Sequence, residues 1–258
     1  MLPPIPISFI DPVSKDNFYR QYVHKSCPVV VRGLADSWPA SRKWDFSYLQ
    51  SQYGEVAPGS VRLTHQQCDF NLENGSKLSP LSLYRTIQDI EQGKTHEGHA
   101  VASPVDVFPP SFQQEYSPPD YCADGAFLRS RVFMGPAGIV TSLHQDLPEN
   151  LYVMVRGRKR ITLFPPESPV YRHSFWSKLP NHARTDPEHP DYHQFPKFRY
   201  AQPYIAEVAA GDTLFIPSFW WHHLRNMEAS IAINFWWSYG MKLPLAWTAA
   251  MYKKVRGF

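Results

Sequence analysis

The chain has few cysteines, little net charge and no long apolar run. Its 258 residues include only 3 Cys, Cys27, Cys68 and Cys122, which form no CxxC pair. Their odd number argues against a disulfide framework and favours a reducing compartment. No run of about 18 apolar residues occurs, and the start, MLPPIPISFIDP, has no basic region followed by an apolar segment. We therefore expect a soluble, cytoplasmic protein without a membrane span.

Charge is nearly balanced as well. The formal net charge is +3, which is too small to predict nucleic-acid binding by itself. The one dense basic cluster spans residues 156–160 and has two interpretations. It is either a solvated hairpin tip with one lysine turned inward, or a rim that attracts an acidic or nucleic-acid substrate. No zinc-finger spacing, heptad repeat or glycine-rich phosphate loop accompanies it.

Aromatic residues and proline, by contrast, are abundant: aromatics make up 15% of the chain, with 8 Trp, and there are 25 Pro. This composition predicts long ordered loops rather than long helices, in a single domain with a sizeable core. We expect N-terminal helices and flanking strands in residues 1–125, a barrel core in 126–238 and a helical tail in 239–258. The tail packs either on its own barrel or on a twin subunit, so a monomer and a homodimer both stay open.

Local patterns predict the individual elements. Capping residues and apolar spacing indicate short helices at 14–23, 43–54 and 80–93. The stretch 165–204 is rich in Pro, His and aromatics, too aromatic for disorder, and we expect it to cover part of an active-site mouth. Apolar runs and alternation predict an entry strand from about 28 and core strands at about 127–134, 137–143, 151–155, 160–164, 205–208, 213–217, 222–227 and 230–238.

The most informative segment is His144-Gln145-Asp146, with His222 after a distant apolar strand. Residues two apart on a strand point to the same face, so His144 and Asp146 can share a metal while Gln145 points away. His222 can add a third ligand from another strand. Two imidazoles and one carboxylate on one side of an ion are typical of non-haem Fe(II) oxygenases. A second His-x-Asp, at 189–191, lies in a Pro-rich stretch and is interpreted as a loop coincidence.

Lys159 is unusual because it begins the apolar face of a strand. It shares that face with Ile161 and Leu163, whereas Arg158 and Arg160 face the other way. Such a lysine either reaches to the rim or meets an anion. Beside a three-residue iron site the second interpretation is favoured, because an iron-bound keto acid needs a cation for its far carboxylate.

Together these motifs resemble the jumonji-C (JmjC) family of Fe(II)- and 2-oxoglutarate-dependent oxygenases. The likeness is carried by residues 141–150, 211–222 and 231–237 and runs from about 28 to 237. Within that family the protein hydroxylases of the asparaginyl and arginyl types are most similar. The resemblance implies a mostly β fold with flanking helices, built on a double-stranded β-helix (a jelly-roll or cupin barrel).

The resemblance also implies roles for single residues. His223 is the rival of His222 as third ligand, but the position after the aromatic pair selects His222. Related enzymes often have a tyrosine that reaches the cosubstrate from an earlier strand; His99 stands there, and that contact stays open. The implied set is His144, Asp146 and His222 as iron ligands, Lys159 and Thr141 as contacts to the 2-oxoglutarate C5 carboxylate, and Asn150 and Asn234 as polar groups beside the metal.

The implied activity is that of a dioxygenase with Fe(II) as cofactor and 2-oxoglutarate and O2 as cosubstrates. It would hydroxylate a side chain of a protein or peptide while 2-oxoglutarate is decarboxylated to succinate. Three alternatives stay open. A lysine demethylase would use the same iron site, and an RNA-base hydroxylase would make use of the basic cluster. A non-oxygenase metal-binding cupin would leave Lys159 without a role.

Overall fold

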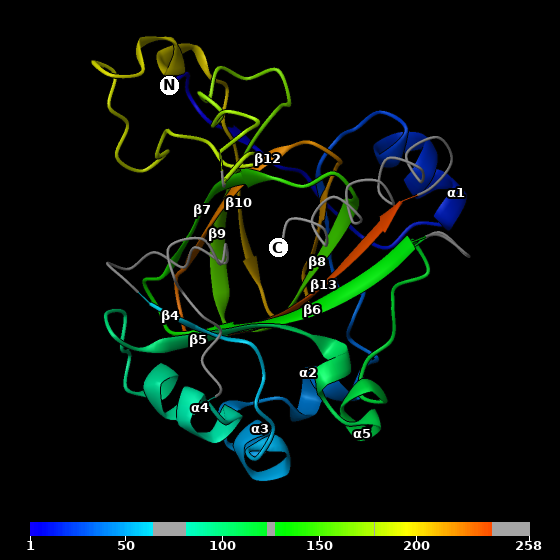
Figure 1. Cartoon of the computed structure of the whole chain (residues 1–258). Helices are drawn as coiled ribbons and strands as arrows, with labels where there is room; N and C mark the ends of the chain where they lie inside the picture. The colour runs from blue at the N-terminus through cyan, green and yellow to red at the C-terminus, as the bar shows by residue number, and fades with distance from the viewer. Residues whose placement is uncertain (64–80, 123–126, 178, 239–258) are drawn as a thin grey trace.

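The computed structural model describes residues 1–63, 81–122, 127–177 and 179–238. Most of this part of the chain forms two sheets that face each other as a barrel, with short helices α2–α5 along the outer side of the larger sheet (Figure 1). The fold is thus mostly β, of the cupin type expected from the sequence. No helix in the described ranges is both long and apolar enough to span a bilayer.

The smaller sheet includes the strand that carries His144 of the His-x-Asp motif. Its strand order is β1-β10-β9-β12-β7, and every neighbouring pair except β1 and β10 is antiparallel. The bounds are β1 (Ile5–Pro6), β10 (Tyr204–Ala209), β9 (Arg158–Phe164), β12 (Trp221–Asn226) and β7 (Val140–Gln145).

The larger sheet has the order β2-β3-β11-β8-β13-β6-β5-β4. The core strands lie within a few residues of the positions expected from apolar alternation. Alternation did not predict β1, β2, β4 or β5, although the resemblance placed His99 on an earlier strand. The bounds are β2 (Phe9–Ile10), β3 (Val29–Val31), β11 (Thr213–Ile216), β8 (Glu149–Arg156), β13 (Ser230–Ser238), β6 (Phe127–Gly135), β5 (His99–Pro104) and β4 (Ser60–Arg62).

The helices are short, as the composition predicts. The helix expected at 43–54 is divided, because Trp44 has an extended backbone and Asp45 then caps a new helix by accepting the Tyr48 N–H at 2.7 Å. The expected tail at 239–258 and Cys68 lie outside the described residues. The helices are α1 (Lys15–Phe18) with a π-helical turn (Tyr19–Val23), α2 (Pro39–Lys43), α3 (Phe46–Tyr53), α4 (Leu83–Glu91), α5 (Pro110–Gln113) and the 3-10 turns Val105–Val107 and Pro196–Tyr200.

The turn at Gly157 does not close a hairpin, contrary to the sequence interpretation. β8 pairs with β11 and β13, whereas β9 pairs with β10 and β12, so the chain passes from one sheet to the other. Gly157 has φ +78°, and a Cβ there would lie 2.4 Å from the Ala229 carbonyl oxygen. The crossing places the inner faces of β8 and β9 opposite each other.

Two apolar clusters hold the helices and the two sheets together. One fills the space between the helices and the larger sheet, and a second fills the barrel interior between the sheets. Removing these side chains from water is the main favourable contribution to folding. The interior cluster contains Ile7, Val30, Tyr152, Met154, Ile161, Leu163, Ala206, Val208, Leu214, Ile216, Trp220, Leu224 and Ala232.

Candidate metal centre

His144 and His222 face each other on neighbouring antiparallel strands. They are direct partners in the register of β7 and β12, and their ring centroids lie 4.0 Å apart. Asp146 follows β7 immediately, and its Oδ2 lies 3.6 Å from His222 Nε2. One potential ligand atom from each of the three residues lies within 4.8 Å of the other two. The structure thus brings together the three residues that the motif spacing singled out.

Backbone carbonyls orient both imidazoles. His144 Nδ1 lies 2.7 Å from the Ser142 carbonyl oxygen, and His222 Nδ1 lies 3.0 Å from that of Trp220. Because a carbonyl oxygen only accepts, each Nδ1 carries the proton, and each Nε2 keeps its lone pair for a metal. The donor set is therefore two imidazole nitrogens and one carboxylate oxygen, which fits Fe(II) with further coordination positions open.

The surroundings of His144 favour its neutral form, which can bind a metal. Burial, followed by the neighbouring imidazole of His222, lowers the pKa of His144 well below its usual value, against the raising effect of the Asp146 carboxylate. The imidazole is therefore neutral near pH 7. The Asp146 carboxylate in turn accepts a hydrogen bond from Trp236 Nε1, at 3.2 Å from Oδ2, which fixes its orientation.

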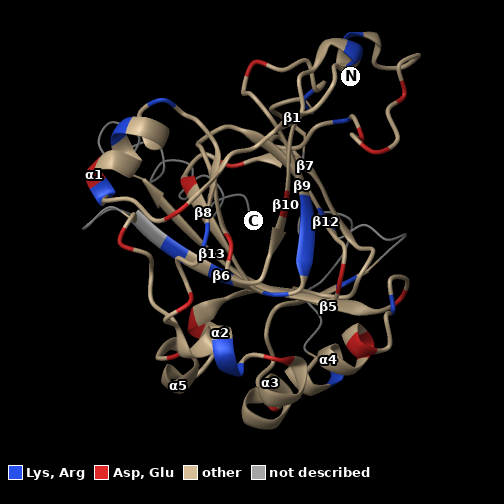
Figure 2. Ribbon diagram, turned by 180° about the vertical axis from the view of Figure 1, so that it is seen from behind, with Lys and Arg blue, Asp and Glu red and all other residues tan. Residues whose placement is uncertain are grey.

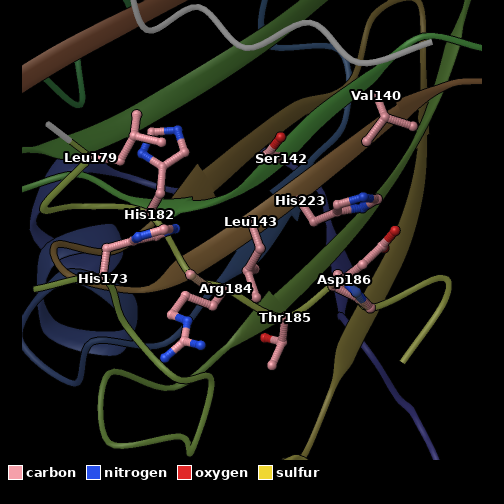
Figure 3. A pocket seen from close by; sticks show the side chains of 12 residues that line it. Val140, Ser142, Leu143, His173, Leu179, His182, Arg184, Thr185, Asp186 and His223 are labelled. Carbon is pink, nitrogen blue, oxygen red and sulfur yellow. The ribbon is translucent and has the colours of Figure 1, made fainter. Parts of the chain in front are cut away.

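His223 lies on the opposite face of β12. It is buried, and its Nε2 has no hydrogen-bond partner among the described residues. Figure 3 shows its ring in a pocket on the outer side of the barrel, with Val140 on one side and Asp186 on the other. This pocket has a volume of about 230 Å³. His222, and not His223, therefore joins the other two potential ligands.

A β-bulge turns Thr141 toward the barrel interior. With unbroken alternation, a residue three positions before His144 would face the other way. In the register of β7 and β12, however, His222 pairs with His144 and Leu224 pairs with Thr141, so one extra residue is accommodated in β7. Thr141 therefore shares the face of His144, opposite Leu224 of the interior cluster.

Lys159 points into the barrel, as alternation predicted. Its side chain is buried, and its Nζ donates a hydrogen bond to Tyr152 Oη at 2.6 Å. Arg158 and Arg160 instead lie on the exposed face, where they form ion pairs with glutamates at 2.7 and 2.8 Å. Tyr152 was missed by the sequence reading. The alternation of β8 contained the signal, because Tyr152 stands two residues after Asn150.

The two asparagines of the expected site are both buried. Asn150 and Asn234 lie on neighbouring strands β8 and β13 and are 3% and 1% exposed. Asn150 Oδ1 has no hydrogen-bond partner among the described residues, so a ligand N–H or O–H could donate to it. Asn234 Oδ1 accepts the backbone N–H of Arg131 at 3.1 Å.

His99 is not part of this group. It lies on β5, where its Nδ1 is 2.8 Å from the Asp89 carboxylate of α4. The imidazole of His99 is thus paired with a carboxylate of α4 and does not belong to the group of potential metal ligands. The phenol beside Lys159 is supplied by Tyr152, from the opposite sheet.

The long segment 165–204 packs on the free edge of β7 (yellow in Figure 1). Gln145 N donates to Asn181 O at 2.9 Å and Ala183 N donates to Leu143 O at 2.8 Å, so residues 181–183 lengthen the sheet locally. Between them, His182 stacks on His144 with ring centroids 5.3 Å apart. The described part of this segment thus lies directly beside the candidate metal centre, which the sequence anticipated without naming His182.

Comparison with known proteins agrees with this geometry. Residues 15–242 match the family model described as a cupin-like domain. Lysine-specific demethylase 8 of Xenopus tropicalis is 31% identical over 233 residues, which cover 87% of this chain and 51% of the relative. The human bifunctional peptidase and (3S)-lysyl hydroxylase JMJD7 is 26% identical over 285 residues, 95% of this chain and 87% of the relative. The tRNA wybutosine-synthesizing protein 5 of Gallus gallus is 25% identical over 260 residues, 92% and 78% respectively. The chain spans about half the length of the lysine-specific demethylase 8 relatives.

Proposed function

The chain belongs to the family of cupin-like JmjC domains, and we propose that it is an Fe(II)- and 2-oxoglutarate-dependent dioxygenase that hydroxylates a side chain of a protein or peptide. One observation carries the proposal: the His144, Asp146 and His222 group opens toward the same barrel interior as the buried Lys159. A metal-binding cupin without oxygenase activity would give this inward-facing lysine no role in binding a cosubstrate.

Each residue has a definite task in this proposal. His144, Asp146 and His222 would hold Fe(II) on one side. Lys159, with the hydroxyl of Thr141, would bind the C5 carboxylate of 2-oxoglutarate by charge-assisted hydrogen bonds. When bound, Fe(II) and 2-oxoglutarate supply the activation of O2, with decarboxylation of the keto acid to succinate.

Other polar groups and the barrel wall complete the site. Trp236 holds the Asp146 carboxylate in place by its indole N–H. Asn150, the cross-strand partner of Trp236, would offer an acceptor that no described residue uses. The apolar floor around Met154 and Ala232 keeps water away from the reacting groups.

A protein or peptide substrate is favoured over RNA. The names of two of the compared relatives refer to lysine or a lysyl residue, and one refers to tRNA. Within the basic cluster at 156–160, Arg158 and Arg160 are each engaged by a glutamate, and Figure 2 shows acidic and basic residues interspersed around the ribbon. This distribution does not favour a phosphate backbone as ligand. We further propose a cytoplasmic location, where iron is kept ferrous.

The test is turnover on cellular proteins. Extract is incubated with the enzyme, Fe(II) and 2-oxoglutarate, and peptides are compared by mass spectrometry. The proposal requires succinate formation together with a mass increase of one oxygen atom that depends on all three components. The His144→Ala variant serves as the control. Demethylation products without a hydroxylated peptide would support the demethylase instead, and no dependence on 2-oxoglutarate would contradict the proposal.

A further inference from the structure

Arg131 lies on the face of β6 that looks into the barrel. Phe133, two residues further along, packs against the interior cluster, with its ring centroid 5.9 Å from that of Tyr152. Val132 and Met134 alternate with Phe133 and belong to the apolar cluster between the helices and the larger sheet. Because side chains on a strand alternate between faces, Arg131 shares the inward face of Phe133.

Cross-strand pairing places Arg131 close to the metal centre. Arg131 pairs with Asn234 of β13, and Asn234 pairs with Tyr152 of β8, so the three form one row across the inner wall. Trp236, the next inward residue of β13, donates to Asp146 Oδ2 at 3.2 Å. Arg131 is therefore one row away from the residue that contacts the metal-binding carboxylate.

The guanidinium of Arg131 has no anionic partner in the described part of the chain. Its one hydrogen bond there is long, 3.5 Å from Nη1 to the Ala102 carbonyl oxygen. The pKa of Arg131 is lowered, mainly by burial and further by the neighbouring charge of Arg129. The carboxylates of Asp146 and the exposed Asp106 act in the opposite direction. Neither aspartate is within ion-pair distance, and a partly desolvated cation without a partner is unfavourable.

We propose that Arg131 binds a carboxylate of the substrate, so that the preferred substrates are peptides with Asp or Glu at or beside the oxidised residue. This inference rests on the proposed function. The charges of Arg129 and Asp106 cancel. In the loaded site, Fe(II), Asp146, doubly charged 2-oxoglutarate, Lys159 and Arg131 would then together carry one net positive charge. One substrate carboxylate neutralises it, and a guanidinium can bind a carboxylate by two parallel hydrogen bonds.

The position of Arg131 favours a substrate carboxylate over two other anions, the C5 carboxylate of 2-oxoglutarate and a phosphodiester. The C5 carboxylate of 2-oxoglutarate would already find a cation and hydroxyl donors in Lys159, Tyr152 and Thr141, with Tyr152 on the other side of Asn234. A phosphodiester is less suited, because it lies within a bulky chain, whereas Arg131 sits on the inward face of β6 between the two sheets. A terminal carboxyl group on a flexible side chain fits this position.

The experiment compares acidic peptides with their neutral counterparts on protein loaded with Mn(II) and the inert analogue N-oxalylglycine. Blocked five-residue glycine peptides carry Asp, Asn, Glu or Gln at the centre. Broadening of their methylene proton signals by Mn(II), with Zn(II)-loaded protein as the diamagnetic reference, measures both affinity and proximity to the metal. At least one acidic peptide is expected to bind about tenfold more tightly than its amide twin, as for a charge-assisted pair.

Variants assign that preference to Arg131. Arg131→Gln is expected to abolish it and Arg131→Lys to retain part of it, while both keep wild-type affinity for N-oxalylglycine. Arg160→Gln, on the exposed face of β9, is the matched control and keeps the preference. If Arg131→Gln does not fold, the wild-type comparison and Arg131→Lys still decide the question.

Four results would overturn the inference. The first two are equal affinity of the wild type for acidic and amide peptides, and an acid preference that survives in Arg131→Gln. The third is a loss of N-oxalylglycine affinity in Arg131→Gln, which would make Arg131 a cosubstrate residue. The fourth is displacement of the acidic peptides by a short oligouridylate that binds more tightly than they do. Absence of any Mn(II)-dependent binding of N-oxalylglycine to the wild type would instead contradict the proposed function itself, and the inference with it.

Discussion

Lys159 and Tyr152 meet across the barrel interior although they belong to opposite sheets. The ammonium of Lys159 donates to the Tyr152 hydroxyl at 2.6 Å and lies 5.2 Å from the centre of its ring. A buried ammonium held in this way is positioned before any ligand arrives, which lowers the cost of ordering it when an anion binds.

Lys159→Ala is expected to weaken binding of 2-oxoglutarate at least tenfold while Fe(II) binding stays nearly intact. Losing one partner of a buried charge-assisted pair costs about 2–5 kcal/mol, and Lys159→Arg should be intermediate because its planar fork is larger. Calorimetric titration of the Mn(II)-loaded protein measures the change. Arg158→Ala and Arg160→Ala are the controls. A loss of 2-oxoglutarate affinity in these two variants but not in Lys159→Ala would mean that the cation that binds the cosubstrate lies on the outer face of β9.

Tyr152→Phe is expected to weaken 2-oxoglutarate binding less than Lys159→Ala does. The substitution removes one hydrogen bond to a charged group, worth about 1.5–3 kcal/mol, but leaves the ring in the interior cluster. The same titration gives the affinity, and the melting temperature checks that the packing is kept. Unchanged affinity with unchanged stability would show that the phenol plays no part in cosubstrate binding.

Removal of His144, Asp146 or His222 is expected to abolish metal binding and turnover, because two remaining protein ligands hold Fe(II) weakly. His223→Ala should retain the metal, since its ring lies on the outer face of β12 (Figure 3). Metal content after gel filtration measures both effects. Loss of iron in His223→Ala with full occupancy in His222→Ala would mean that the register of β12 is wrong by one residue.

Trp236→Phe is expected to lower metal affinity about tenfold, the usual effect of removing a group that orients a ligand. The indole N–H is the donor that holds Asp146 Oδ2, and phenylalanine keeps much of the ring without that donor. Competition with a chelator measures the affinity. Wild-type metal affinity in a folded Trp236→Phe protein would show that Asp146 needs no such support.

Mn(II) and N-oxalylglycine together should raise the melting temperature more than either alone, because both bind the folded state and the second completes the site. Thermal unfolding followed by fluorescence provides the measurement. Melting curves that respond to metal but not to N-oxalylglycine would favour a metal-binding cupin without oxygenase activity.

Glu115 is expected to make stability depend on acid pH. Burial raises the pKa of Glu115, but hydrogen bonds from Tyr48, Trp44 and Lys43 outweigh it and hold the pKa below its usual 4.5. A lowered folded-state pKa contributes stability that is present above the unfolded value and is lost as pH falls through the folded value. Glu115→Gln should therefore be less stable than wild type near pH 7 and lose less of its stability on acidification. Parallel curves of stability against pH would contradict this assignment.

Much of the fold was determined by short-range pattern in the sequence. Apolar alternation located β6 to β13 within a few residues, and it also set Lys159 inward with Arg158 and Arg160 outward. The side-chain period of a strand is two, so these assignments need no knowledge of the neighbours. The spacing of His144 and Asp146 on one face follows from the same rule. By contrast, β1, β2 and β4 have only two or three residues each, and the six-residue β5 shows little alternation of polar and apolar residues.

Tertiary structure decided the features that depend on which strands pair and in which register. The bulge that turns Thr141 inward exists only in the pairing of β7 with β12. The meeting of Tyr152 with Lys159 requires the crossing between sheets at Gly157, and the row that carries Arg131 toward the metal centre requires β13 between β6 and β8. Likewise, His182 reaches His144 only because residues 181–183 add to the edge of β7. These contacts join positions far apart in the chain. The strand period in the sequence therefore determined most of the inward-facing side chains, Thr141 being the exception, and strand pairing decided which of them meet.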